Sequence, residues 1–323
     1  MFTDTLLDWF ALHGRDLPWR HTQDPYAIWL SEVILQQTRI QQGMDYWFRF
    51  MERWPRVENL AAATEDEVLR MWQGLGYYSR ARNLHTAAQQ IVAQGGFPTQ
   101  LEDIKRLKGV GDYTAAAIGS IAFGLPAAVV DGNVYRVLAR HYGIDTPINS
   151  TQGKKVFAEL AQSLLPADQP SRFNQAMMDF GAIQCTPTSP RCVICPVQET
   201  CEALRTGRIN ELPVKEKKLK VQTRHLDYLY VRHQGKTAIR KRGKGDIWQG
   251  LWEVVTPVTI PGARLLRKDV KHVLTHRILL ADFYYLETTE PPTLPEGYIW
   301  VDENDLDQYA FPRLLEILFE SLP

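Results

Sequence analysis

The stretch LKGVGDYTAAA, residues 107–117, says more about the fold than any other part of the sequence. Gly109 and Gly111 predict a tight turn that opens onto a helix starting near Asp112. Such a turn exposes backbone N–H groups at the helix N-terminus, where they can bind a phosphate oxygen without net positive charge. A Gly-x-Gly turn is also common between ordinary helices, so the flanking sequence has to decide between the two interpretations.

Helical segments flank this turn on both sides. The preceding LEDIKRL predicts a short helix, and the following TAAAI continues the second helix. Helix, glycine turn and helix in this order resemble the helix-hairpin-helix element of DNA-binding proteins. We therefore expect Gly109 and Gly111 to contact a nucleic acid backbone.

The composition is that of an ordinary globular protein. The 323 residues carry no formal net charge, 45% are hydrophobic and 23% are charged. These values exclude a disordered or fibrous chain, and the length predicts two domains. A net charge of zero does not argue against DNA binding, because local patches rather than totals guide it.

No segment predicts secretion or a membrane span. The N-terminal MFTDTLLDWFALHG has Asp4 and Asp8 where a secretory signal needs basic residues, so it predicts a helix of the mature protein. Residues 113–130 are uncharged, but Gly119 and Pro126 interrupt them, which favours a buried helix and its exit loop. We expect a cytoplasmic, nucleoid-associated protein with no targeting signal, in a compartment that keeps thiols reduced.

The sequence pattern changes near residue 225. Before it the chain is helical almost throughout: Thr64 to Glu67 predicts a capping box, and Gly95 and Gly96 end a helix that begins at Ser79. After it, short strands are predicted for HLDYLYVRH, KTAIRKR, ILLADFYYLE and GYIWVDE. Between the two parts, LPVKEKKLKVQTR predicts a basic linker or a merely solvated connector.

All four cysteines lie within residues 185–201, with the spacing C-x6-C-x2-C-x5-C. Thiolates so close in sequence can converge on one centre, and the prolines between them keep the loops from forming helix. Zinc and a [4Fe-4S] cluster both accept four thiolates, so the spacing leaves the two open. Two disulfides are the less favoured alternative in a reducing compartment.

Two carboxylates stand out in the helical part. In AVVDGNVYRVLAR, Asp131 ends an apolar run and precedes a new helix, where a simple N-cap is the first interpretation. In YAIWLSEVILQQT, Glu32 is the single carboxylate of a helix that is apolar almost all round. Burial raises the pKa of such a group, as a general acid requires, although a buried ion pair is an equally good interpretation.

The order of these motifs resembles the endonuclease III superfamily of helix-hairpin-helix DNA glycosylases. Within it, the chain is similar to the adenine DNA glycosylases of the MutY type, which remove adenine mispaired with 8-oxoguanine. The resemblance covers essentially the whole chain, and it is carried by DLPWR, WLSEVILQQT, GLGYYSRARNLH, LKGVGDYTAAAI, VDGNVYRVLAR and FNQAMMDFGA.

This resemblance implies a multidomain fold. An all-α glycosylase core is expected over residues 1–207, with a six-helix barrel module at about 22–127 and an iron-sulfur cluster module formed by 1–21 and 128–207. A basic linker over 208–224 and an α+β Nudix-like domain over 225–323 are expected to follow. No Nudix hydrolase box with paired glutamates is present in that domain, so pyrophosphate hydrolysis is not predicted.

The resemblance also implies the catalytic roles. Glu32 is expected to protonate adenine at N7 and then to act as base on water, while Asp131 stabilises the oxocarbenium-like sugar. Tyr113 and Asn133 match positions near the sugar that hold the intermediate and orient Asp131. Bifunctional relatives have a lysine in the hairpin where this chain has Tyr113, so a monofunctional glycosylase is expected.

Recognition residues follow from the same match. Arg20 and Gln175 are expected to line the adenine pocket, although the glutamine is equally consistent with packing support. Leu35, Gln37 and Tyr77 match positions that enter the duplex, with Tyr77 as a wedge beside the oxidised guanine.

The cysteines and the C-terminal domain complete the expected sites. Ligands of a [4Fe-4S] cluster are implied at Cys185, Cys192, Cys195 and Cys201. Where many relatives have Phe-Ser-His in the C-terminal domain, this chain has Leu274-Thr275-His276. We expect Thr275 and His276 to read 8-oxoguanine, with less stacking surface than a phenylalanine provides.

The leading hypothesis is therefore a monomeric glycosylase whose partner is duplex DNA with adenine opposite 8-oxoguanine or guanine. A bifunctional glycosylase and lyase for oxidised pyrimidines is the enzymatic alternative, disfavoured by the missing hairpin lysine. The alternative that is not an enzyme is a non-catalytic DNA-binding module. Its function should tolerate the loss of the carboxylates of Glu32 and Asp131.

Overall fold

The computed structural model describes residues 2–216, 221–258 and 260–323. The chain forms two compact units, one made of Met1–Ala61 with Thr86–Lys217 and the other of Ala62–His85 with Lys218–Pro323. Three lysines of the predicted basic linker, Lys217, Lys218 and Lys220, lie outside the described residues. The stretch before them is anchored, because Asn149 exchanges hydrogen bonds of 2.9 and 3.0 Å with the backbone of Glu216.

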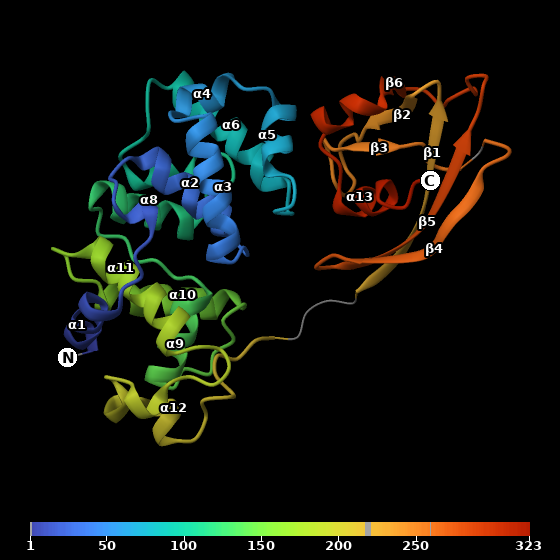
Figure 1. The fold of residues 1–323 in the computed structure, drawn as a ribbon. Helices are drawn as coiled ribbons and strands as arrows, with labels where there is room; N and C mark the ends of the chain where they lie inside the picture. The colour runs from blue at the N-terminus through green and yellow to red at the C-terminus, as the bar shows by residue number, and fades with distance from the viewer. Residues whose placement is uncertain (1, 217–220, 259) are drawn as a thin grey trace. The chain divides into compact units, whose positions relative to one another are not determined.

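Described residues of the first unit form helices and loops (Figure 1). The helices before the hairpin are α1 (Phe2–His13), a 3-10 turn at Pro18–Arg20, α2 (Pro25–Leu35), α3 (Ile40–Arg53), α4 (Val57–Ala62) and the second half of α6 (Ser79–Ala93). Those that follow are α7 (Leu101–Lys105), α8 (Asp112–Phe123), α9 (Gly132–Tyr142), α10 (Thr151–Leu164), α11 (Pro170–Asp179) and α12 (Glu202–Arg205). Predicted helicity up to this point is confirmed.

Helix α2 lies at the centre of this unit. Asp24 caps its N-terminus by accepting a hydrogen bond from the N–H of Tyr26, and Pro25 occupies the first turn. Every residue from Tyr26 to Ile34 is buried, as an apolar surface on all sides of a helix predicts. Helix α8 packs directly against α2, so residues on these two helices can meet inside the unit.

The glycine hairpin joins α7 to α8. Gly109 has φ of 77°, a left-handed conformation that a side chain would strain. Gly111 is extended and no side chain caps α8, so the first N–H groups of this helix are not satisfied by a local cap. The predicted turn and its opening onto a helix at Asp112 are confirmed.

Asn174 on α11 fixes the loop that leads from α8 to α9. Its side chain is fully buried, accepts from the N–H of Val129 at 3.0 Å, and donates to Ser120 Oγ at 2.9 Å and to the Ala127 carbonyl at 2.8 Å. These bonds satisfy backbone groups of a loop that forms no regular ladder. The loop is therefore held in place two residues before Asp131.

The second unit begins with α5 (Glu65–Trp72) and the first turns of α6. Thr64 and Glu67 form the predicted capping box in full. The mixed sheet of this unit contains β1 (Gln222–His233), β2 (Lys236–Lys241), β3 (Trp252–Val254), β4 (Arg264–Val273), β5 (Arg277–Glu287) and β6 (Ile299–Asp302). Its order is β3-β2-β1-β5-β4, with β6 paired to β2.

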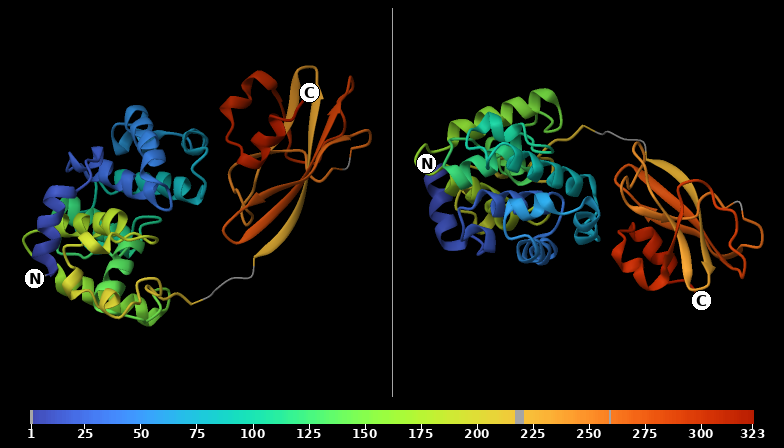
Figure 2. Two further views of the ribbon diagram at one scale, coloured as in Figure 1. Left: turned by 60° about the horizontal axis from the view of Figure 1, so that its bottom comes forward. Right: turned by 90° about the horizontal axis from the view of Figure 1, so that it is seen from above.

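The strand pairing explains where the core of this sheet lies. β1 and β5 pair in parallel along their length, while the other pairs of strands are antiparallel. Alternate residues of β5, from Leu279 to Tyr285, pack with Tyr228 and with leucines of α13 (Arg313–Phe319). The ribbon of α13, in red, lies on one face of the sheet (Figure 2). Two strands, β3 and β4, were not predicted, and β1 begins at Gln222 rather than near 225.

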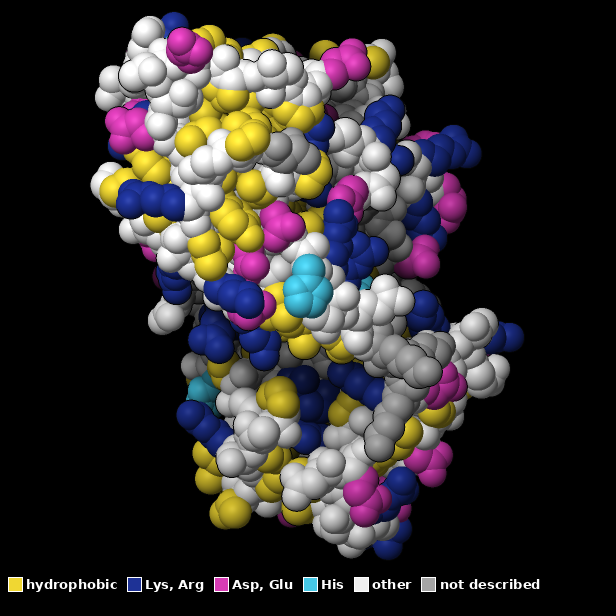
Figure 3. All heavy atoms as spheres, turned by 90° about the vertical axis from the view of Figure 1, so that its right-hand side faces the viewer, with side chains coloured by type: hydrophobic (Ala, Val, Ile, Leu, Met, Phe, Trp, Pro, Cys, Tyr) yellow, Lys and Arg dark blue, Asp and Glu magenta, His cyan; other side chains and the backbone are white. Residues whose placement is uncertain are grey.

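Side chains of both charges are mixed on the surface, in agreement with the zero net charge of the chain. On the face in Figure 3, Lys and Arg side chains lie among acidic and apolar ones. No helix in the described ranges has the length and apolar character needed to cross a bilayer.

Candidate active site

Glu32 and Tyr113 meet inside the first unit. The Tyr113 hydroxyl donates to Glu32 Oε2 at 2.6 Å, although the two residues are 81 positions apart in the sequence. Glu32 is on α2, is only 7% exposed, and has buried apolar neighbours along its helix. Tyr113 is in the first turn of α8, directly after the glycine turn. The hairpin therefore brings a phenol to the lone carboxylate.

Burial makes Glu32 a group that titrates near neutrality. Burial raises the pKa of Glu32 to about 7, and the nearby charge of Asp131 acts in the same direction. The hydrogen bond from Tyr113 and the charge of Arg20 lower the pKa and so limit the shift. A carboxyl group in this condition can donate a proton near neutral pH and accept it again, as a general acid and base must.

Asp131 is the N-cap of α9, and its carboxylate accepts several hydrogen bonds. Its Oδ1 accepts from the N–H groups of Asn133 and Val134 at 2.9 and 2.8 Å, so it caps α9. Its Oδ2 accepts from Asn133 Nδ2 at 2.9 Å. Burial raises the pKa of Asp131, while these donors and the charge of Arg136 oppose the shift by favouring the carboxylate. The carboxylate is thereby held in one orientation.

Arg136 links this carboxylate to the cysteine loop. Its Nη2 donates to Asn133 Oδ1 at 2.8 Å and to the Gly181 carbonyl at 2.5 Å, and its Nε donates to the Cys185 carbonyl at 2.7 Å. A chain of hydrogen bonds therefore runs from Asp131 through Asn133 and Arg136 to the first cysteine. The planar guanidinium suits this role because its N–H groups point in fixed directions.

Arg20, expected in the adenine pocket, forms an ion pair with a buried residue of α11. Its Nη1 and Nη2 each donate to the carboxylate of Asp179 at 2.8 Å. Gln175 lies one turn earlier on α11, half-buried, and donates to Ser171 Oγ at 2.9 Å. The hydroxyl of Tyr113 is 3.9 Å from Met178 Sδ, so α11 also reaches the Glu32 site.

Residues expected to face the duplex differ in exposure. Leu35 is the last residue of α2 and is half-buried, and Gln37 just after it is exposed with φ of 60°. Gly109 and Gly111 in the hairpin are exposed. A positive φ at a non-glycine residue is strained and often marks a functional position.

Tyr77 and Thr275 meet within the second unit. Tyr77 is 46% exposed with φ of 46°, and its hydroxyl is hydrogen-bonded to that of Thr275. Thr275 and His276 occupy the exposed turn between β4 and β5. Two residues expected to contact the oxidised guanine thus lie together, although they come from distant parts of the sequence.

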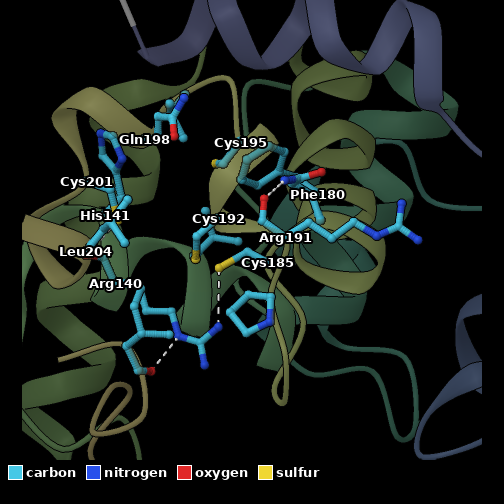
Figure 4. Close-up of a pocket in the computed structure, with 15 residues that line it drawn as sticks. Arg140, His141, Phe180, Cys185, Arg191, Cys192, Cys195, Gln198, Cys201 and Leu204 are labelled. Carbon is cyan, nitrogen blue, oxygen red and sulfur yellow. Dashed lines mark hydrogen bonds between the residues drawn. The ribbon is translucent and has the colours of Figure 1, made fainter. Parts of the chain in front are cut away.

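The four cysteines line one pocket (Figure 4). All four are free thiols, and burial raises the pKa of Cys195 to about 11, with the charges of the other three acting in the same direction. Arg140 donates to Cys185 Sγ at 3.5 Å, along the dashed line in Figure 4. The described residues contain no group of three or more His, Cys, Asp or Glu side chains already arranged as metal ligands. The cysteines therefore share a pocket rather than a preassembled ligand cage.

Comparisons with known proteins show which family the chain belongs to. A family model described as "HhH-GPD superfamily base excision DNA repair protein" matches residues 30–166, and a "NUDIX domain" model matches residues 227–321. An adenine DNA glycosylase of Buchnera aphidicola (Baizongia pistaciae) is 34% identical over 257 residues, which is 78% of this chain and 72% of that protein. The chain belongs to the adenine DNA glycosylase family.

Other relatives support the family assignment. The adenine DNA glycosylase of Mus musculus is 43% identical over 226 residues, and the match covers 66% of this chain but only 44% of the length of the mouse protein. The solved structure of a thermostable thymine-DNA glycosylase superposes with a TM-score of 0.59 at 33% identity, covering 64% of this chain and 95% of the other. The predicted adenine DNA glycosylase resemblance and the predicted order, a helical core and then a Nudix-like domain, are confirmed.

Sequence reasoning missed Arg136, Arg140 and Asp179 in this member of the adenine DNA glycosylase family. Arg136 and Arg140 are buried on α9 among Val134, Val137 and Leu138. A charged residue on an otherwise apolar helix face is a detectable signal, because burial of an unpaired charge is costly. Asp179 ends the FNQAMMD stretch, but its two arginine partners precede it by 159 and 164 residues, and no local pattern connects them.

Proposed function

We propose that this chain removes adenine that is paired with 8-oxoguanine in duplex DNA, by hydrolysing the N-glycosidic bond without cutting the strand. The pair formed by Glu32 and Tyr113, beside a capped Asp131, is the observation that carries the proposal. It supplies a neutral acid near pH 7 and a fixed carboxylate inside one compact unit. The family assignment supports adenine as the base.

The base has to leave the duplex before these groups can reach it. Unstacking and unpairing cost a few kcal/mol, least for a mispaired base. The extruded adenine then accepts a proton at N7 from Glu32. As the bond between C1′ and N9 breaks, its electron pair goes to the base, which departs neutral because of that proton.

The sugar becomes oxocarbenium-like as the bond lengthens. Asp131 stabilises the positive charge electrostatically or through a transient covalent bond, in the orientation fixed by Asn133 and Val134. Water then adds at C1′, and its proton goes to the Glu32 carboxylate, which restores the acid. Tyr113 holds Glu32 in place through both steps.

The absence of strand cleavage follows from the residue at the hairpin. A lyase needs an amine that attacks C1′ to form a Schiff base, and Tyr113 has a phenol instead. Lys105, at the end of α7, is engaged in ion pairs with Glu102 at 3.2 Å and Asp112 at 3.3 Å. We therefore propose a monofunctional enzyme.

We also propose a [4Fe-4S] cluster held by Cys185, Cys192, Cys195 and Cys201. The donor set fits: four free thiols line one pocket, and thiols with raised pKa values ionise when they bind a metal centre. The cluster folds and crosslinks this loop when bound. Arg140 bonds to Cys185 Sγ and to the carbonyls of Thr186 and Pro187 at 2.7 and 3.0 Å, which orients the loop that carries the ligands.

Lesion reading is assigned to the second unit. The Tyr77 and Thr275 hydroxyls and the exposed His276 offer hydrogen-bonding groups and an aromatic ring for an oxidised purine. In the first unit, N–H groups of the hairpin bind the DNA backbone. We also propose that the protein acts as a monomer in the cytoplasm, at the nucleoid, where thiols stay reduced.

The test compares the wild-type chain with Glu32→Gln on a duplex carrying one adenine opposite 8-oxoguanine. Loss of the acid should lower the single-turnover rate roughly 10²- to 10⁴-fold, with duplex affinity within about threefold of wild type. Glu52→Gln, the same substitution at an exposed residue of α3, is the matched control and should leave the rate unchanged. Equal rates for wild type and Glu32→Gln would exclude the proposed role.

A further inference from the structure

Asp179 is a buried carboxylate bound by two arginines of the N-terminal segment. It ends α11 and has no exposed surface. Arg15 donates to it through its backbone N–H at 2.8 Å, through Nε at 2.9 Å and through Nη2 at 2.5 Å. Arg20 adds two more bonds at 2.8 Å. These five bonds hold the pKa of Asp179 below its ordinary value in spite of burial.

The same bonds fix the plane of the Arg20 guanidinium. Nη1 also donates to the Arg15 carbonyl at 2.8 Å, and the guanidinium lies over the Phe10 ring at 5.5 Å. Among the residues that the structure describes, these contacts engage three of the five N–H donors. The Nε hydrogen and one Nη2 hydrogen remain for a ligand, in directions set by the ion pair with Asp179.

The location of Asp179 connects the Arg20 guanidinium to the active site. Gln175 lies one turn before Asp179, on the same face of α11. The adjacent Met178 contacts the Tyr113 hydroxyl. Arg20 is also among the groups that set the pKa of Glu32. The ion pair therefore ties the N-terminal segment to the helix that reaches Glu32 and Tyr113.

We propose that Asp179 is a positioning residue: it holds Arg20 so that the two remaining N–H donors meet ring nitrogens of the extruded purine beside Glu32. This inference rests on the proposed function. A carboxylate can hold the Arg20 guanidinium in this way, because its two oxygens accept hydrogen bonds from Nη1 and Nη2 of Arg20. The amide in Asp179→Asn keeps the size of the side chain but replaces one acceptor with a donor, which faces the donors of both arginines.

The experiment uses the full chain with its metal centre and four variants, Asp179→Asn, Arg20→Gln, the double variant and Arg15→Gln as a matched control. Single-turnover rates are measured on the duplex with adenine opposite 8-oxoguanine. Dissociation constants are measured on the same duplex with a tetrahydrofuran abasic analogue in place of the adenosine, so that no base is present to bind.

Both single variants should lower the rate by roughly tenfold to a hundredfold, because misplacement of a positioning group by about 1 Å costs this much. Affinity for the tetrahydrofuran duplex should change less than threefold. The double variant should be no slower than Arg20→Gln, because residues that act through one another are not additive. Arg15→Gln keeps both bonds from Arg20 to Asp179, so its rate should stay within threefold of wild type.

The pH profile separates positioning from a purely structural role. Glu32 is influenced by Tyr113 on α8, by Asp131 before α9 and by Arg20. The charge of Arg20 lowers the pKa of Glu32, so displacement or loss of that charge should raise it. The basic limb of the rate profile should therefore move to higher pH in Asp179→Asn and in Arg20→Gln but not in Arg15→Gln.

Three results would overturn the inference: an additive double variant, an equal loss of rate in Arg15→Gln, or a normal rate in Asp179→Asn. If Asp179→Asn does not fold, Arg20→Lys decides, because lysine keeps the charge without the fork; a wild-type rate there also overturns the inference. A wild-type protein that leaves adenine in place contradicts the proposed function itself, which is a different result.

Discussion

The Tyr113 hydroxyl donates a hydrogen bond of 2.6 Å to Glu32 Oε2. This bond stabilises the ionised carboxylate and lowers the pKa of Glu32, against the burial that raises it to about 7. Desolvation of the half-buried Tyr113 phenol raises its pKa well above the ordinary value, and the charges of Glu32 and Asp131 act in the same direction. Tyr113 therefore keeps its proton and remains a hydrogen-bond donor to Glu32 at every pH at which Glu32 titrates.

Replacement of Tyr113 by phenylalanine should move the pH profile upward. Loss of the donor removes a group that favours the carboxylate, so the pKa of Glu32 rises above about 7 and the protonated acid persists to higher pH. The basic limb of the single-turnover rate should shift to higher pH accordingly. Tyr135→Phe, elsewhere in the same unit, is the control and should leave the limb unchanged. A downward shift in Tyr113→Phe would contradict the account.

Replacement of Tyr113 by lysine should create the missing amine. A lysine at the start of α8 places an amine beside Glu32 and Asp131, where attack on C1′ gives a Schiff base. Borohydride should then trap the protein on DNA that contains the adenine, and some strands should break without alkali. Lys108→Arg is the control, because it removes the amine of the native lysine nearest the hairpin turn. Trapping of the wild-type chain at the level of Tyr113→Lys would show that another amine is already in place.

Replacement of Arg136 by lysine should loosen Asp131. Lysine cannot span Asn133 Oδ1, the Gly181 carbonyl and the Cys185 carbonyl at once. Unsatisfied buried groups should lower the free energy of unfolding by about 1–3 kcal/mol, and the single-turnover rate should fall roughly tenfold. Arg172→Lys on α11, an exposed arginine, should leave both unchanged. A normal rate in Arg136→Lys would show that the link is not needed for catalysis.

Replacement of Asn174 by alanine should destabilise the loop before Asp131. The change leaves the Val129 N–H and the Ala127 carbonyl without their bonds in a buried site, and the free energy of unfolding should fall by about 2–4 kcal/mol. Urea denaturation followed by circular dichroism measures the change. Gln162→Ala is a matched control, since this exposed amide bonds the same loop at Ala128 and Pro126. A smaller loss for Asn174→Ala than for Gln162→Ala would contradict the argument from burial.

Local signals in the sequence predicted local structure correctly. The capping box at Thr64, the glycine stop after α6 and the N-cap at Asp131 each depend on residues within a few positions of one another. Glu32 was recognisable because its helix is apolar on every side. Each of these features is determined by contacts along a single segment.

Features that depend on distant partners could not be predicted in the same way. The pair of Arg20 and Asp179 joins residues 159 positions apart, and Asp179 alone looks like an ordinary helix terminus. Strand β4 was missed because its sequence RLLRKDVKHV is charged and lies at the edge of the sheet, where one side needs no apolar alternation. Strand β3 has three residues, too few to show a period.

The most direct test is single-turnover cleavage of a duplex with one adenine opposite 8-oxoguanine, with and without alkali and with borohydride, beside a duplex with an oxidised pyrimidine. For a monofunctional adenine glycosylase, strand breaks at the adenine are expected only after alkali, with little trapping by borohydride. Breaks at the oxidised pyrimidine without alkali, together with trapping on that strand, would contradict the account and show that a lysine rather than the pair of Glu32 and Tyr113 determines the chemistry.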